Sequence, residues 1–305
     1  MISIVVPTFN RSKSLLVAVQ SILKVKHANI EIIIVDDASD DDTHKTINVL
    51  NNINLKEEYL HRLIHIKNEN NIGTAKSKLK GIEVAEGDYI GFLDDDDIWT
   101  NELINFESDI SSRCDIILYN FQMHSKIDNT TRLFNLKKYQ NNFEYNVAKT
   151  MGGIFMQACL FKKEFILSHK NHLDDKATPS EDWDFFLTLA KEKPSIHYSN
   201  KIIFQWNLHE KSQSFNIEKE TFALGYILYK HESFFKKNKK LLSNHHRIIA
   251  NRLYYEKAYN QGDIYIRDAF TLYPYQIKNI LWRCFIDLPK TIRLPIHQLY
   301  NKKIL

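Results

Sequence analysis

Short apolar runs alternate with helix-type patterns over the first 120 residues, and this alternation restricts the fold more than any other feature of the sequence. The runs Ile2–Val6, Ile30–Val35 and Tyr89–Leu93 are too short for helices and are bounded by polar residues, which is typical of buried strands. Between the first two runs, apolar residues recur at the spacing of one helix face: Leu15, Leu16, Val19, Ile22 and Leu23. Such alternation forms βαβ units, so we expect an α/β domain with a mainly parallel central sheet.

The rest of the chain is divided by the same patterns. Further strands are expected at Leu63–Ile66, Ile116–Tyr119, Ala158–Phe161 and Ile202–Trp206, and helices at about Thr74–Glu86 and Glu181–Lys191. From Ile217 onward only helical patterns occur. We therefore predict a domain of residues 1–215 and a basic helical C-terminal extension of residues 216–305.

Charge is distributed unevenly along the chain. Residues 236–305 contain fourteen Lys/Arg and four Asp/Glu, a balance of +10, whereas the remainder holds 27 Lys/Arg and 33 Asp/Glu, a balance of −6. In residues 278–305 the basic residues are interleaved with Leu, Ile, Trp, Phe and Tyr. This pattern predicts peripheral contact with an anionic membrane, each basic residue adding about 1 kcal/mol. The alternative is that the apolar residues pack on the domain. No motif for nucleic-acid binding accompanies the charges, so no nucleic-acid partner is expected.

Cysteine usage and the N-terminus favour a cytoplasmic protein. Cys114, Cys159 and Cys284 lie too far apart for a CxxC metal site and do not form a disulfide framework. The N-terminal residues lack the basic region and the long apolar run of a signal peptide. No stretch of eighteen apolar residues occurs, so no transmembrane helix is expected.

The loop after the first strand excludes the usual backbone sites for phosphate. Its residues, Thr8–Ser12, include no glycine, and neither GxGxxG nor GxxxxGK[ST] occurs in the chain. A bound nucleotide must therefore have its phosphates held by side chains, with the help of a metal ion.

The metal candidate is the run Asp94–Asp97, which directly follows a strand. Two like charges about 4 Å apart repel by roughly 4 kcal/mol at an effective dielectric near 20. Four adjacent acids therefore require a cation or the protonation of some of them. Mn²⁺ or Mg²⁺ would suit, because such ions combine few carboxylates with phosphate oxygens. The alternative is a solvated acidic turn, with Asp97 capping a helix that begins near Trp99.

Five segments in order resemble motifs of family 2 glycosyltransferases and together cover roughly residues 1–215. They are Ser3–Arg11, Ile34–Asp41, Asn71–Trp99 with its DxD-like acids, Glu181–Asp184 and His209–Ser214. The resemblance implies a GT-A fold, a nucleotide-diphosphate sugar donor and inverting transfer to an acceptor hydroxyl. It also implies a glycan or lipid-linked glycan acceptor, as in the synthesis of lipopolysaccharide, O-antigen or capsule.

The resemblance also implies roles for individual residues. Thr8 and Asn10 would lie beside the nucleoside, and Asp37, with Asp36 as its neighbour, would accept from the N3–H of uracil. Further donor contacts fall on Lys78, Asp94 and Asp95, Lys78 standing where the family often has an Arg-Asn pair. Asp96 and His209 would hold the metal, Asp182 would be the general base, and Glu181 and Trp99 would contact the acceptor.

Each of these roles has a structural alternative. Asp36 and Asp37 could cap the following helix, and Glu181 and Asp182 suit a helix N-terminus without any catalysis. A lone histidine such as His209 is often structural, and Trp99 could be a core residue. Two rival functions also stay open: the same fold with a GDP- or dTDP-sugar donor, and a non-catalytic nucleotide- or glycan-binding module.

Overall fold

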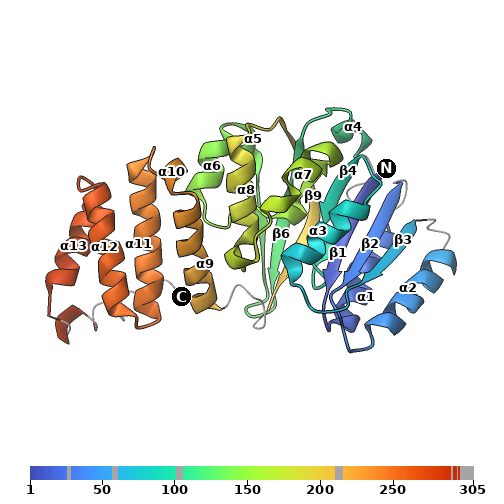
Figure 1. Ribbon diagram of the computed structural model, residues 1–305, viewed down its shortest axis with the longest axis horizontal. Coiled ribbons are helices and arrows are strands. Elements are labelled where there is room, and N and C mark those ends of the chain that lie inside the picture. Colours follow the sequence, from blue (N-terminus) through green and yellow to red (C-terminus); the bar gives the residue numbers. More distant parts are fainter. Residues whose placement is uncertain are drawn as a thin grey trace. The chain divides into compact units, whose positions relative to one another are not determined.

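The computed structural model describes residues 1–25, 29–56, 61–100, 106–209, 216–289, 291–293 and 295 (Figure 1). The chain divides into two compact units. The first comprises Met1–Asp175 and Glu181–Ser212, and the second comprises Lys176–Ser180 and Gln213–Leu305.

Four parallel strands form one half of the sheet in the first unit. They are β1 (Ile2–Thr8), β2 (Ile30–Asp36), β3 (Arg62–Lys67) and β4 (Tyr89–Phe92), in the spatial order β3-β2-β1-β4. All residues of β1, β2 and β4 are buried, which explains their nearly continuous apolar sequence. The predicted parallel sheet is thus confirmed in this half.

Helices α1 (Ser12–Leu23), α2 (Thr43–Lys56) and α3 (Thr74–Val84) connect these strands. Because crossovers between parallel strands are right-handed, α1 and α2 share one face of the sheet. Helix α3 returns the chain past β1 and therefore covers the opposite face, where it packs on β1 and β2. A helix after Asp37 was expected only as an alternative and without bounds, and α2 lies there.

The other half of the sheet is mixed. Strand β8 (Cys159–Lys162) pairs antiparallel with β4 and with β6 (Ile116–Ser125), and β6 runs parallel to β9 (Ile196–Leu208). A further strand, β7 (Thr130–Phe134), pairs with β6. Strands β6 and β9 are longer than predicted because their ends alternate polar and apolar residues, which a search for apolar runs misses.

The helix expected to begin near Trp99 is a strand instead, which corrects that prediction. Strand β5 (Ile98–Trp99) pairs antiparallel with β9 at the edge of the sheet. The carboxylate of Asp97, interpreted as a possible helix cap, accepts from the backbone N–H of Asn207 at 2.8 Å. An acid before an apolar pair therefore has its partner 110 residues away rather than in its own turn.

Shorter elements complete the first unit: α4 (Glu107–Ile110), α5 (Lys137–Gln140), α6 (Phe143–Lys149), the 3₁₀ turn η2 (Met156–Ala158), α7 (Lys163–His169), the 3₁₀ turn η3 (Lys170–His172) and α8 (Glu181–Lys191). Helix α8 has the predicted bounds. It buries Trp183, whose indole N–H donates to the carbonyl of Val147 at 2.9 Å, as well as Phe185 and Phe186.

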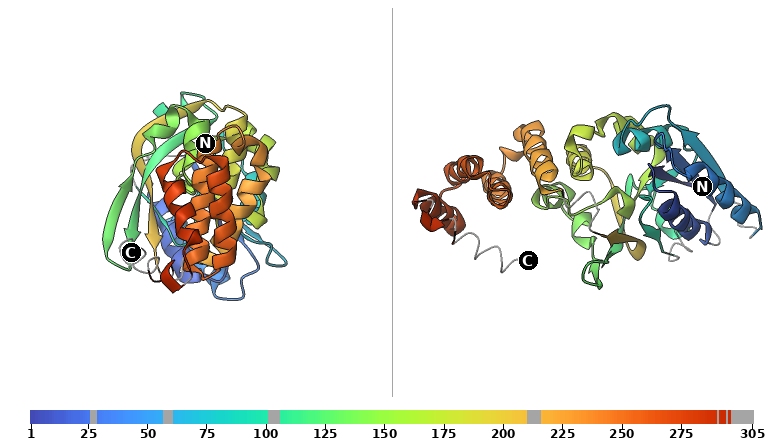
Figure 2. Two further views of the ribbon diagram at one scale, coloured as in Figure 1. Left: turned by 90° about the vertical axis from the view of Figure 1, so that its left-hand side faces the viewer. Right: turned by 90° about the horizontal axis from the view of Figure 1, so that it is seen from below.

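The second unit has the 3₁₀ turn η4 (Asp175–Ala177) at its border and is otherwise helical where it is described: α9 (Ile217–Lys230), α10 (Glu232–Phe235), α11 (Lys239–Tyr255), α12 (Tyr259–Leu272) and α13 (Ile277–Asp287). Asn216 and Asn238 cap α9 and α11, each accepting from a backbone N–H three residues on. Helices α11, α12 and α13 lie side by side (Figure 2). Ala250, Tyr254, Ile266 and Ile286 form their core. Within the described residues, no helix is both long enough and apolar enough to cross a membrane.

Candidate active site

Acidic side chains gather where the parallel strands end. Asp36 is the last residue of β2, Asp37 follows it, and Asp94 comes two residues after β4. Since β1, β2 and β4 run parallel, these acids and Thr8 at the end of β1 share one edge of the sheet. This edge is where ligands of open α/β sheets bind.

The carboxylate of Asp37 organises the loop between β3 and α3. Its Oδ1 accepts from the side chain of Asn68 at 2.8 Å and from the N–H of Ile72 at 2.9 Å. Its Oδ2 accepts from the N–H of Gly73 at 2.8 Å. Gly73 has a φ of +88°, which favours glycine. Three of the four acceptor positions of the carboxylate are thus used within the loop, and no described residue donates to the remaining position on Oδ2.

Asn10 and Asp36 fix the two loops that precede this one. Asn10, with a φ of +53°, accepts from the N–H of Asp40 through its side chain at 2.9 Å, and its own N–H donates to Ser39 Oγ. Asp36 is fully buried and accepts from the N–H of Ser39 at 2.8 Å. Asp36 therefore supports the turn; Asp37 beside it is also buried, at 4% exposed, whereas Asn10 is exposed.

Arg11 binds two of the four consecutive aspartates. Its guanidinium lies 3.0 Å from Asp95 Oδ1 and 2.7 Å from Asp96 Oδ2. Thr8 donates to the other oxygen of Asp95 at 2.7 Å. Burial raises the pKa of Asp95 to about 6, although Arg11 and Thr8 act in the opposite direction. Arg11 was not among the predicted site residues. The sequence could have indicated it, because Arg11 directly follows Asn10 at the end of the first motif that resembles the family, Ser3–Arg11.

Asp96 and His209 meet across 113 positions of sequence. His209 Nε2 lies 3.2 Å from Asp96 Oδ2, and both side chains are partly exposed, 28% for His209 and 22% for Asp96. Asn207, two residues earlier, donates to the carbonyl of Asp96 at 2.8 Å. A carboxylate and an imidazole at this separation fit a divalent cation that takes its other ligands from phosphate oxygens. In the described part of the chain, no group of three or more His, Cys, Asp or Glu side chains could hold a metal by itself.

Lys78 lies between Asp94 and Asp182. Its Nζ is 3.5 Å from Asp94 Oδ1 and 3.8 Å from Asp182 Oδ1, and only 2% of the side chain is exposed. In this placement the ammonium group faces protein carboxylates and is closed off from solvent, which argues against the predicted donor contact of Lys78.

The turn η2 touches the same two acids from the other side. The N–H of Met156 donates to Asp182 Oδ2 at 3.0 Å, and the side-chain amide of Gln157 donates to Asp94 Oδ2. Neither residue was predicted. A backbone N–H donor such as that of Met156 leaves no signal in the sequence, and a single glutamine in an apolar stretch does not by itself indicate a site. Asp182 itself remains 16% exposed and Asp94 37%, although the Oδ1 atom of each is buried.

Glu181 is more buried than its neighbour. It is 9% exposed, and its Oε2 has no hydrogen-bond partner among the described residues. Burial raises the pKa of Glu181 to about 7, with Lys78 acting in the opposite direction. Burial likewise raises the pKa of Asp182, against the effect of Lys78. A buried carboxyl oxygen without a partner is unfavourable unless the group is protonated or a ligand supplies a donor.

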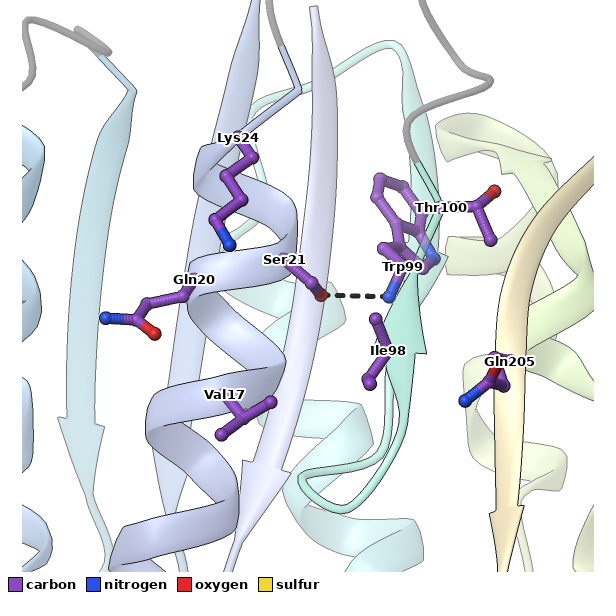
Figure 3. A pocket seen from close by; sticks show the side chains of 8 residues that line it. All are labelled: Val17, Gln20, Ser21, Lys24, Ile98, Trp99, Thr100 and Gln205. Atoms are coloured by element: carbon purple, nitrogen blue, oxygen red, sulfur yellow. Dashed lines mark hydrogen bonds between the residues drawn. The ribbon is translucent and has the colours of Figure 1, made fainter. Parts of the chain in front are cut away.

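Trp99 does not present a ring face to this cluster. Its side chain is 2% exposed, and its backbone N–H donates to Ser21 Oγ at 2.9 Å (Figure 3). It lines a cavity of about 350 Å³, together with three residues of α1 and with Lys24, Ile98, Thr100 and Gln205. Stacking on a sugar requires an exposed ring, so the burial corrects the expected acceptor role and makes Trp99 a core residue.

Comparison with known proteins identifies the family. The sequence model described as Glycosyl transferase family 2 matches residues 3–166, more than half of the chain. The chain belongs to glycosyl transferase family 2. Its members are transferases, and the predicted family and enzyme class are thereby confirmed.

Two bacterial relatives show how far the sequence similarity extends. Glycosyltransferase GlyG of Streptococcus pneumoniae is 34% identical over 130 residues, 42% of this chain and 41% of GlyG, so the match spans less than half of that relative. The Escherichia coli enzyme WfaP, a UDP-Glc:alpha-D-GlcNAc-diphosphoundecaprenol beta-1,3-glucosyltransferase, is 37% identical over 105 residues, 34% of this chain and 39% of WfaP.

Solved structures confirm the GT-A fold. TarS of S. aureus (residues 1–349), in complex with UDP-GlcNAc, matches with a TM-score of 0.60 at 15% identity, covering 88% of this chain and 91% of that one. The mannosyltransferase PcManGT from Pyrobaculum calidifontis, in complex with GDP-Man and Mn²⁺, matches with a TM-score of 0.58 at 13% identity, covering 97% and 84%.

Proposed function

We propose that this family 2 enzyme transfers a hexose, with inversion, from a nucleotide-diphosphate sugar to a hydroxyl of a lipid-linked or growing surface glycan. One observation carries the proposal: Asp182 and Asp94 lie within 4 Å of the same Lys78 ammonium group, and Asp94 is one of the acids at the edge of the sheet. Those acids follow strands that resemble the donor side of the family, and Asp182 comes from the half that would hold the acceptor.

The proposed reaction is a single displacement. Asp182 accepts the proton of the acceptor hydroxyl while the hydroxyl oxygen attacks C1 of the sugar. The bond between C1 and the diphosphate oxygen breaks through an oxocarbenium-like transition state, and its electron pair stays on the leaving nucleoside diphosphate. Attack opposite the leaving group inverts the configuration at C1. Glu181 would accept a hydrogen bond from the acceptor through its unpartnered oxygen.

We propose Asp96 and His209 as the residues that hold a divalent cation, Mn²⁺ or Mg²⁺. When bound, such an ion would neutralise the charge that develops on the leaving diphosphate. Arg11, 36% exposed and paired with Asp96, adds a protein cation at the same place. The presence of Mn²⁺ in the PcManGT complex is consistent with this assignment.

UDP is the favoured nucleotide, because WfaP is named for UDP-Glc and TarS was crystallised with UDP-GlcNAc. A GDP donor is the second candidate, since PcManGT was crystallised with GDP-Man. WfaP also acts on a diphosphoundecaprenol-linked sugar, which supports a lipid-linked acceptor and a role in bacterial polysaccharide synthesis.

The experiment is a panel of UDP-, GDP- and dTDP-sugars, each tested with and without a GlcNAc-diphospholipid acceptor. Release of nucleoside diphosphate that increases with the acceptor supports transfer. Binding of a nucleotide sugar with no turnover under any condition would favour the non-catalytic binding module.

Asp37 is expected to contribute to nucleotide binding through its remaining acceptor position. Asp37→Ala should weaken UDP binding at least about tenfold by calorimetry, while kcat falls less than KM rises, because a lost base contact is felt in ground and transition states alike. Asp42→Asn, at an exposed aspartate five residues on, is the matched control and should bind UDP normally. Unchanged UDP affinity in Asp37→Ala would withdraw the uracil assignment.

Membrane contact through residues 278–305 stays a proposal, and of these the structure describes 278–289, 291–293 and 295. Helix α13 exposes several apolar side chains, among them Ile277 (73%) and Leu281 (62%). A truncation before α13 would also remove Ile286 from the core, so substitution of exposed residues is the sharper test. Ile277→Ser with Leu281→Ser should reduce sedimentation with anionic vesicles severalfold at low salt.

The control for this experiment is Ile127→Ser with Leu133→Ser, two residues of the first unit that are 50% and 61% exposed. This control should sediment like the wild type, and neutral vesicles should recover little of either protein. Equal recovery of the α13 variant and the control would contradict the membrane proposal.

A further inference from the structure

A lysine buried among carboxylates is the feature of this site that the proposed reaction leaves unexplained. Lys78 lies on α3, and its ammonium group is within 4 Å of both Asp94 and Asp182. Burying an ammonium ion is unfavourable unless charged partners compensate it, so these contacts are what keep the lysine charged there. Lys76, two residues earlier, is 61% exposed and pairs with Asp175 instead.

The two acids are held on both sides, which closes a ring. Lys78 lies near the Oδ1 atoms of both Asp94 and Asp182. From η2, the Met156 N–H donates to Asp182 Oδ2 and the Gln157 side chain donates to Asp94 Oδ2. Each acid therefore has one oxygen hydrogen-bonded to η2 and the other beside the buried ammonium group, which orients both carboxylates toward Lys78.

We propose that Lys78 is a positioning residue for the base: it fixes Asp182 relative to Asp94 and stabilises the ionised form of Asp182, and it does not bind the diphosphate. This inference rests on the proposed function of Asp182. A general base must be ionised before it can take a proton, so Lys78 would set the lower pH limit of the reaction.

Several charged and titratable groups lie around Asp182. Burial raises the pKa of Asp182, Asp94 raises it further, and Lys78 and the Met156 N–H lower it. Glu181, with a pKa raised to about 7 by burial, shares the same lysine. Cys159 on β8 also faces Asp182, and burial raises the pKa of its thiol, so it stays neutral. Burial opposes the charge on Lys78, but Asp94, Asp182 and Glu181 outweigh it and raise the pKa of the lysine.

The sign of the effect follows from these neighbours. Asp182 works in its deprotonated form, so kcat should fall as pH decreases through the pKa of Asp182. Removing Lys78 removes a cation that favours the deprotonated form, so the fall should begin at higher pH. A rate set by the ionised fraction changes tenfold for each unit of pH below that pKa.

The experiment compares the pH dependence of kcat in the full chain, using the nucleotide sugar that the donor panel identifies. Lys78→Met should move the acidic limb upward by about one unit or more and leave the Kd for UDP within twofold of the wild type. Lys78→Arg keeps the charge and should keep the limb within half a unit. Lys76→Met, on the same helix, is the matched control and should reproduce the wild-type limb.

Two further variants cover the case in which Lys78→Met does not fold. Lys78→Met in a Glu181→Gln background leaves one fewer buried charge, and its limb is compared with that of Glu181→Gln alone. Asp94→Asn keeps Lys78 and removes a carboxylate that competes for it, so its limb should move to lower pH.

The proposal is overturned if Lys78→Met keeps the wild-type limb, or if it weakens UDP binding tenfold or more, as a diphosphate ligand would. Failure of the wild type to transfer any sugar would count instead against the proposed function. In that case the UDP measurement alone still decides whether Lys78 binds the diphosphate.

Discussion

Asp182→Asn is expected to lower kcat at least about a hundredfold while the Kd for UDP stays within twofold of the wild type. The asparagine keeps the shape of the side chain and can still accept from the Met156 N–H, but it cannot take the proton of the acceptor hydroxyl. Glu181→Gln should be milder, because Glu181 is assigned to hydrogen bonding with the acceptor. Both measurements use initial rates at saturating donor.

The pair of variants also separates two outcomes. Near-normal turnover in Asp182→Asn would mean that the base is misassigned. If Glu181→Gln were the inactive variant instead, the two acids would exchange roles, and the family and fold would be unaffected.

Asp96→Ala is expected to remove most activity, and excess EDTA should do the same to the wild type. Asp96 supplies the carboxylate next to His209, and without it the proposed cation would keep only the imidazole as a protein ligand. Addition of Mn²⁺ or Mg²⁺ after EDTA should restore the wild type but not the variant. Asp128→Asn, at an exposed aspartate in the turn before β7, is the control and should keep normal turnover.

Full turnover of the wild type in excess EDTA would contradict the proposal that Asp96 and His209 hold a metal ion needed for the reaction. Arg11 would then be the remaining cation beside Asp96, and its substitution would become the informative experiment.

The parallel half of the fold could be predicted because the burial of each strand is visible in the strand's own sequence. Strands β1, β2 and β4 are buried on both faces, so their sequences are nearly continuous apolar runs with polar residues after their ends. The edge strand β5 could not be predicted in this way. It is two residues long, and the partner of the acid before it, Asn207, comes from β9.

The residues of the candidate site also fall into those that could be located from sequence and those that could not. Acids at strand ends, such as Asp37 and Asp94, can be located from sequence because the strand itself marks them. The partners of Lys78 could not be located from sequence. They come from the loop after β4 and from α8, and they meet only in the folded chain. Burial, which decided against Trp99 as an acceptor residue, is likewise a property of the tertiary structure.

The most direct test of the central claim, a single displacement with Asp182 as the base, is the configuration at C1 of the transferred sugar. The product of the wild-type enzyme, formed from the donor and lipid-linked acceptor that the panel identifies, is examined by NMR. One in-line attack predicts a configuration opposite to that of the donor. A product with the donor's configuration would contradict the account, because retention requires a second displacement or a different attacking group.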